Sequence, residues 1–69
     1  MSVYKIVEII GTSPTSWEDA AQKALTTASK TLEELRIAEV VKQDMTIDKG
    51  KITSFRVRLN LSFKYRESE

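Results

Sequence analysis

The 69-residue sequence contains neither cysteine nor histidine. Without cysteine, the chain forms no disulfide and offers no thiolate to a metal or a substrate. Without histidine, it lacks the commonest zinc ligand and the commonest general base near neutral pH. The serines of the segment 11–16 therefore have no histidine to activate them, and no glycine-rich phosphate loop is present. We expect a protein that is not an enzyme.

An excess of one charge and a long apolar run are also missing. The chain carries 11 Lys and Arg against 10 Asp and Glu, for a net charge of +1. A nucleic-acid-binding domain normally has a basic excess, so we expect no nucleic-acid partner. No stretch approaches the roughly 20 apolar residues of a membrane span, and the N-terminus shows no secretion signal. We expect a cytoplasmic protein without membrane contact.

The length predicts one domain over residues 1–69. A domain of this size buries only about 60% of the surface of its unfolded chain. Small domains usually gain stability from disulfides, a metal or oligomerisation. Since the residues for the first two are scarce or absent, oligomerisation is the support that we expect.

A strand and a helix are predicted in the first half of the chain. Residues 3–10 are rich in β-branched side chains, which favours a strand, and residues 11–16 are typical of a turn. Thr15 and Glu18 fit a capping box, with Ser13 as a competing helix cap. No glycine caps the C-terminus of the helix, so its end is predicted only loosely, between residues 32 and 36, and its apolar side chains fall on one stripe. They are Trp17, Ala20, Ala21, Ala24, Leu25, Ala28, Leu32 and Leu35.

Two further strands are predicted in the second half. In residues 37–47, the adjacent Val40 and Val41 indicate either a bulge or two partly apolar faces. Residues 48–51 form a hairpin turn with Gly50 in the left-handed position. Residues 55–66 alternate strictly, with apolar Phe55, Val57, Leu59, Leu61, Phe63 and Tyr65 on one face.

These elements predict the α+β class with the order β-α-β-β. The three strands would form an antiparallel sheet in the order 1-3-2, wrapped around the helix on its apolar face. One helix covers only part of so long a face, and residues 3–10 are apolar on both sides. Because exposed apolar surface is a liability for a monomer, we expect other subunits to cover it.

The polar face of the third predicted strand carries a basic ladder, made of Arg56, Arg58, Lys64 and Arg66. The ladder could bind an anion such as phosphate. The alternative, which the even charge balance favours, is cross-strand pairing with Glu8, Glu39 and Asp44. The aromatic residues of this strand lie on the other face, which argues against base stacking on RNA.

Two other kinds of side chain have a functional and a structural interpretation. Trp17, at the first helical turn, is more typical of a core or interface anchor than of a ligand platform. The carboxylates could contribute oxygen ligands to a calcium site built across subunits, although surface carboxylates are the simpler interpretation. They are Glu39, Asp44, Asp48, Glu67 and Glu69.

The segments "VYKIVEIIGTSPTSWEDAAQKAL", "SKTLEEL", "AEVVKQ" and "FRVRLNLSFKY" together resemble the dodecin family over nearly the whole chain. The resemblance implies a hollow homo-dodecamer with cubic 23 symmetry. Many dodecins bind flavins in pairs inside this shell and store or buffer them without catalysis. Some bacterial relatives bind coenzyme A, and one subgroup binds calcium and lacks the flavin signature.

The resemblance also implies which positions would contact a flavin. Flavin-binding dodecins open the strand after the helix with a tryptophan that stacks on the isoalloxazine ring, and Ile37 takes its place here. They also carry a glutamine on the third strand, which Arg56 replaces. Stacking contributes about 0.5–1.5 kcal/mol beyond the burial of area, and arginine has donors only. Flavin binding of the family type is therefore expected to be weakened or lost.

The segments "SVYK", "GTSPTSWE" and "QDM" resemble the calcium-type dodecins most. Asp44 and Met45, from the last of these segments, join Ile37 and Arg56 as candidate binding residues. We expect a homo-dodecamer that stores a small ligand or ion, which could be weakly bound flavin, calcium, coenzyme A or another anionic ligand. Two alternatives stay open, namely a flavin-storing dodecin that tolerates the substitutions and a purely structural shell.

Overall fold

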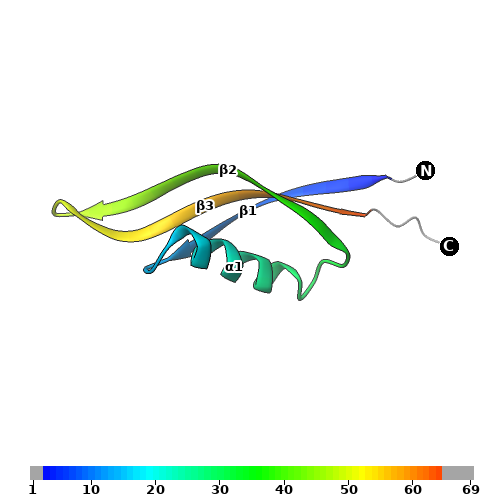
Figure 1. Cartoon of the computed structure of the whole chain (residues 1–69), viewed down its shortest axis with the longest axis horizontal. Helices are drawn as coiled ribbons and strands as arrows, with labels where there is room; N and C mark the ends of the chain where they lie inside the picture. The colour runs from blue at the N-terminus through cyan, green and yellow to red at the C-terminus, as the bar shows by residue number, and fades with distance from the viewer. Residues whose placement is uncertain (1–2, 65–69) are drawn as a thin grey trace.

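The computed structural model describes residues 3–64 and contains three strands and one helix (Figure 1). Their order is β1 (Tyr4–Ser13), α1 (Trp17–Ala28), β2 (Leu35–Asp48) and β3 (Lys51–Lys64). The sheet has the order β1-β3-β2, and both strand pairs are antiparallel. The predicted fold class and strand order are confirmed.

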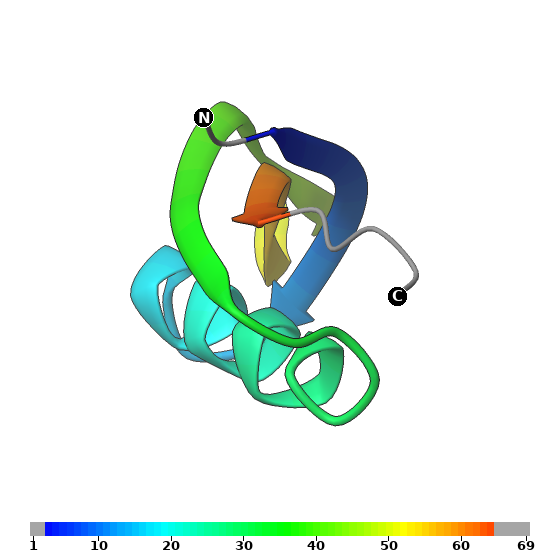
Figure 2. The same ribbon diagram turned by 90° about the vertical axis from the view of Figure 1, so that its right-hand side faces the viewer.

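The sheet is strongly curved around the helix. In the end-on view of Figure 2, β1 and β2 arch to either side of β3, and α1 lies across the open side of the sheet. The described molecule measures 54 × 20 × 14 Å and is therefore elongated along the strands. The helix, at 12 residues, is neither long nor apolar enough to cross a membrane.

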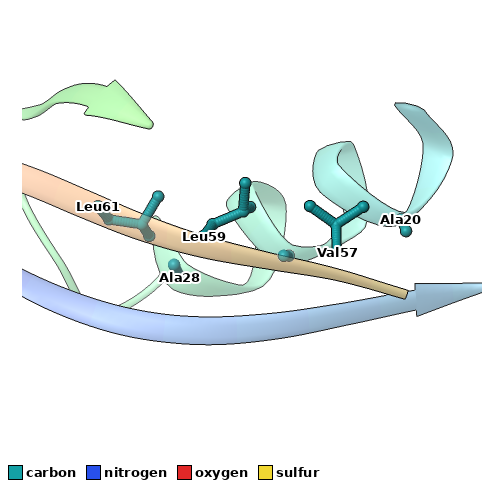
Figure 3. Packing of buried hydrophobic residues seen from close by; sticks show 6 residues of the cluster. Ala20, Ala28, Val57, Leu59 and Leu61 are labelled. Carbon is teal, nitrogen blue, oxygen red and sulfur yellow. The ribbon is translucent and has the colours of Figure 1, made fainter. Parts of the chain in front are cut away.

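The core lies between the middle strand and the helix. Figure 3 shows the buried side chains of β3 next to the alanines of α1. The buried hydrophobic residues are Val57, Leu59 and Leu61 on β3 and Ala20, Ala24 and Ala28 on α1. The helix approaches β1 closely at Gly11, since a Cβ added there would overlap the Ala20 carbonyl oxygen and lie 2.9 Å from the Ala24 Cβ. The strict alternation predicted for β3 thus identifies the face on which the helix packs.

The start of the helix differs from the prediction. Ser16 is the N-cap residue, and its Oγ accepts a hydrogen bond of 3.0 Å from the Asp19 N–H. Neither predicted cap, Thr15 or Ser13, has this role. The Ser13 hydroxyl is buried and donates to Asp19 Oδ2 at 2.6 Å, while its oxygen accepts from the Thr15 N–H at 2.9 Å. The predicted caps were wrong because β1 extends to Ser13, which leaves Ser16 next to the first helical turn.

The end of the helix also differs from the prediction, because α1 ends at Ala28. Ser29 is the C-cap residue, and its N–H and its hydroxyl both donate to the Leu25 carbonyl, at 2.9 and 2.8 Å. Leu32 and Leu35 keep the apolar spacing of the helix, but they pack against the core from outside it. Between them, Glu34 has a φ of 57° and turns the chain into β2.

β2 and β3 are longer than predicted and are joined by a two-residue turn. Lys49 and Gly50 have φ values of 52° and 77°, as a type I′ hairpin turn requires. The left-handed position predicted for Gly50 is confirmed. The register shifts between Val40 and Lys42, so the bulge is the correct one of the two alternatives for the adjacent valines. Tyr65, Arg66, Glu67 and Glu69, named in the predictions, lie outside the described residues.

The far end of the hairpin extends past β1 and α1 (Figure 1). β1 ends at Ser13, opposite Phe55, so β1 does not pair with residues 46–54, which we call the arm. Ile47 and Ile52 face each other there and are 65% and 52% exposed. A two-stranded hairpin is marginally stable in water by itself. Contact with another surface would therefore stabilise the arm.

Candidate functional site

Three of the four candidate residues lie on the side of the sheet opposite α1, which we call the outer face. Its central row consists of Arg56, Arg58, Asn60 and Ser62 of β3, since the residues between them face the helix. Directly opposed residues of neighbouring strands share a face. Ile37 lies opposite Ser62 and Asp44 lies opposite Arg56, so both belong to the outer face. The fourth candidate, Met45, lies opposite Phe55 and points to the helix side.

A single chain does not bring the two predicted flavin positions together. Ile37 pairs with Ser62, six residues from Arg56 along β3. At about 3.3 Å per residue, the two positions are roughly 20 Å apart. The Ile37 side chain is 67% exposed. A site that uses both positions would have to combine residues of different subunits.

Ile37 also borders an open groove between α1 and β2. The groove has a volume of about 370 Å³, and Leu25 and Leu61 contribute apolar side chains to its lining. Small-ligand sites usually range from about 300 to 1,000 Å³ and are mostly apolar. The groove is thus large enough for a small ligand or for side chains of another subunit.

Arg56 and Asp44 form a bidentate ion pair across β3 and β2. Arg56 Nε donates to Asp44 Oδ1 at 2.7 Å, and Nη2 donates to Oδ2 at 3.1 Å. Both side chains are 40% exposed. The hydrogen bonds from Arg56 hold the pKa of the Asp44 carboxyl below its usual value, and they raise the pKa of Arg56. The cross-strand pairing considered for the basic ladder is confirmed at this position.

Trp17 of α1 also contacts Asp44. Its indole Nε1–H donates to the backbone carbonyl of Asp44 at 3.0 Å. Its ring meets Phe55 edge to face, with centroids 5.0 Å apart and an interplanar angle of 73°. The interpretation of Trp17 as a core anchor is confirmed. The contact with Asp44 was not predicted. The sequence indicated only that the indole N–H of an anchoring tryptophan would need some hydrogen-bond acceptor.

The residues of one subunit do not fit a flavin in the way the family would hold it. Ile37 has no flat face for the ring, and two donors of Arg56 are already engaged by Asp44. The chain offers the flavin an aliphatic contact and a cation in place of an indole and an amide.

A calcium ion does not fit the described residues of one subunit either. Within residues 3–64, no group of three or more acidic side chains lies close enough to hold a metal. Both carboxylate oxygens of Asp44 accept hydrogen bonds from Arg56. Since calcium takes six to eight oxygen ligands, the described residues of one chain do not supply a set of carboxylates for it.

Comparison with known proteins identifies relatives along the whole chain. The calcium dodecin of Mycobacterium tuberculosis is 51% identical over 70 residues, which cover 100% of this chain and 97% of the relative. Its crystal structure, described as that of a calcium-chelating antigen with a novel calcium-binding site, has a TM-score of 0.83 and covers 99% of this chain and 97% of its own.

Two other relatives agree with this result. The dodecin of Thermus thermophilus is 39% identical over 66 residues, which cover 96% of both chains. The structure of dodecin from Streptomyces coelicolor has a TM-score of 0.92 at 36% identity, and covers 97% of this chain and 96% of its own. The sequence model of the dodecin family matches residues 3–66. The chain therefore belongs to the dodecin family.

Proposed function

We propose that this chain assembles into a cytoplasmic homo-dodecameric shell with 23 symmetry, which binds a small ligand or ion without catalysis. We propose further that its flavin binding is weaker than is typical of the family. One observation carries the second part: Arg56, at the position of the flavin-binding glutamine, is held by Asp44 through two hydrogen bonds. The family membership supports the first part.

The distribution of apolar side chains supports assembly. The buried hydrophobic cluster contains six residues, three of which are alanines. Ten large hydrophobic side chains are at least 37% exposed: Val3, Tyr4, Ile6, Ile10, Ile37, Val40, Val41, Met45, Ile47 and Ile52. Exposed apolar surface of this extent is typical of protein–protein contacts. Neighbouring subunits would remove much of it from water.

The weaker flavin binding follows from two physical effects. Isoleucine keeps an apolar contact but loses the stacking energy, about 0.5–1.5 kcal/mol for an aromatic pair. Arginine cannot accept a hydrogen bond, whereas the glutamine amide has both a donor and an acceptor. A flavin that displaced Asp44 from Arg56 would also break two charge-assisted hydrogen bonds.

A riboflavin titration tests this proposal, with quenching of the flavin fluorescence as the signal. We expect the double variant Ile37→Trp/Arg56→Gln to bind riboflavin at least tenfold more tightly than the wild-type protein. Lys30→Trp is the control, because Lys30 is exposed and lies just past α1, away from both flavin positions and from the arm. Wild-type protein that binds as tightly as the double variant would contradict the proposal.

Calcium is the second candidate ligand, favoured by the 51% identity to the calcium dodecin. The proposed ion is shared between subunits, since residues 3–64 of one chain hold no acidic cluster. Calorimetric titration of the assembled protein with calcium chloride tests this candidate. Saturable binding that magnesium does not reproduce would support calcium, and the absence of heat would remove it.

A further inference from the structure

Two cations lie directly opposite each other on the outer face. Lys42 of β2 pairs with Arg58 of β3, and Ile10 of β1 flanks Arg58 on its other side. Side chains at such positions have Cβ atoms about 4.5–5.5 Å apart, and like charges there destabilise a sheet. Neither cation has an ion pair in the described part of the chain. The row that runs across the three strands through Ile10, Arg58 and Lys42 thus has two positive charges and no negative one.

The neighbouring rows do not cancel these charges. In one of them, both oxygens of Asp44 accept hydrogen bonds from Arg56, so these two side chains neutralise each other. The pKa of Asp44 is lowered first by the hydrogen bonds from Arg56, and the charges of Lys42 and Arg58 lower it further. The positive fields of all three cations therefore overlap at this carboxylate.

The row on the other side contains two carboxylates at the sheet edges. Glu8 and Glu39 flank Asn60, which lies two residues from Arg58 along β3. Diagonal neighbours on a sheet face are about 7–8 Å apart, a separation that long side chains can span. Neither glutamate forms an ion pair with Lys42 or Arg58 within residues 3–64.

The two cations also border a small notch. Its lining consists of Ile10, Lys42, Asp44, Arg56 and Arg58, and its volume of about 10 Å³ fits a single oxygen-sized group. A phosphate group has several terminal oxygens, so one can enter the notch while others accept from both cations. The planar guanidinium of Arg58 suits two oxygens of a phosphate, and the ammonium of Lys42 adds a point charge.

We propose that Lys42 and Arg58, beside the Asp44–Arg56 pair, form a binding site for a small oxyanion of the phosphate class. The proposal deepens the proposed function and rests on it, because it names the class of ligand that the shell would take. The occupant is a free anion. A carboxylate of a neighbouring subunit is the competing occupant, and the test separates the two.

The test measures inorganic phosphate binding by calorimetry at constant ionic strength, since salt screens such contacts. We expect Lys42→Gln/Arg58→Gln to weaken phosphate binding at least tenfold. The control Lys30→Gln/Lys49→Gln removes the same net charge from two exposed positions elsewhere, and we expect it to bind within twofold of wild type. No phosphate binding by the wild type, or an equal loss in the control, would overturn the site.

Melting temperature gives a second readout. Removal of two opposed cations relieves repulsion, so the double variant should melt no lower than wild type in phosphate-free buffer. Phosphate should raise the melting temperature of wild type and control, and leave that of the double variant unchanged. A double variant that already melts lower without phosphate would contradict the repulsion argument and overturn the proposal.

Particle mass from light scattering, recorded on each sample, separates the site from the shell. Phosphate binding that depends on Lys42 and Arg58 in particles smaller than a dodecamer would support the site and contradict the proposed shell. Dodecamers that bind no phosphate would contradict the site alone. A double variant that loses mass while the control does not would show that the cations serve a subunit contact, which overturns the proposal.

Discussion

Asp44 connects three elements through two different groups. Its carboxylate accepts two hydrogen bonds from Arg56 on β3, and its backbone carbonyl accepts one from the indole of Trp17 on α1. The carboxylate bonds depend on ionisation, whereas the carbonyl bond does not. The same residue therefore has a pH-dependent and a pH-independent role.

Acidification should reveal the pH-dependent role. The pKa of Asp44 is lowered in the folded chain, mainly by hydrogen bonds from Arg56. Its stabilising contribution is thus fully present above the ordinary carboxyl pKa of about 3.9 and is lost as the pH falls through the lowered value. We expect Asp44→Asn to melt a few degrees lower than wild type near pH 7. We also expect it to lose less stability between about pH 5 and pH 2.

Thermal melts at fixed protein concentration measure this difference, because the melting temperature of an oligomer depends on concentration. Part of the acid loss should persist in the variant, since hydrogen bonds from Ser13 and Lys23 also lower the pKa of Asp19. Asp48→Asn, at the end of the same hairpin, is the control. Identical acid profiles for wild type and Asp44→Asn would contradict the prediction.

At the scale of elements, the sequence predicts what depends on a repeating pattern. The apolar face of β3 was predictable because every second residue from Val57 to Leu61 is buried on the helix side of the sheet. The end of α1 was not, because Leu32 and Leu35 keep the helical spacing while they contact the core from a loop and a strand. Spacing along the chain does not distinguish these two ways of reaching the core.

In the candidate site, too, the sequence predicted local patterns but not contacts between distant residues. The pairing of Asp44 with Arg56 was one of two predicted alternatives, because opposite charges on adjacent strands tend to pair. The separation of Ile37 from Arg56 required the register of β2 on β3, which includes a bulge at Val41. The bond from Trp17 to Asp44 joins residues 27 positions apart, a contact that no local pattern encodes.

The close approach of α1 to β1 leads to a prediction at the scale of elements. A Cβ on Gly11 would overlap the Ala20 carbonyl oxygen and lie 2.9 Å from the Ala24 Cβ. Since the obstacle is mainly helix backbone, Gly11→Ala should lower the free energy of unfolding by about 1–3 kcal/mol. Urea unfolding at fixed protein concentration measures the change. Thr12→Ala, at the exposed next position, should have little effect, and equal stability of both variants would contradict the packing argument.

At the scale of the whole molecule, the elongated shape limits how much of the chain one subunit can bury. A body 54 Å long and 14 Å thick has little interior, and within residues 3–64 the arm at its end lies beyond both β1 and α1 (Figure 1). Ile47 and Ile52 at the arm are more than half exposed. These features favour an arm that completes its packing on another subunit.

Substitution on the arm tests this expectation. Ile47→Glu places a charge on a side chain that is 65% exposed in one chain, so it should not disturb the fold of the subunit. If the arm contacts another subunit, the charge would be buried without a partner. We expect the mass from light scattering to fall below the roughly 95 kDa of twelve 7.9-kDa chains. Ile47→Leu should retain the full particle, and an unchanged mass for Ile47→Glu would contradict the contact.

The slender alanine-lined core has a consequence for the amount of protein that a cell must make. Six buried hydrophobic residues leave the lone chain with little stability of its own, so assembly supplies much of it by mass action. The fraction of chains in shells then rises steeply above a threshold concentration. If the shell is the binding form, as proposed above, a cell whose chain concentration lies near this threshold would lose more than half of its binding capacity on producing half as many chains.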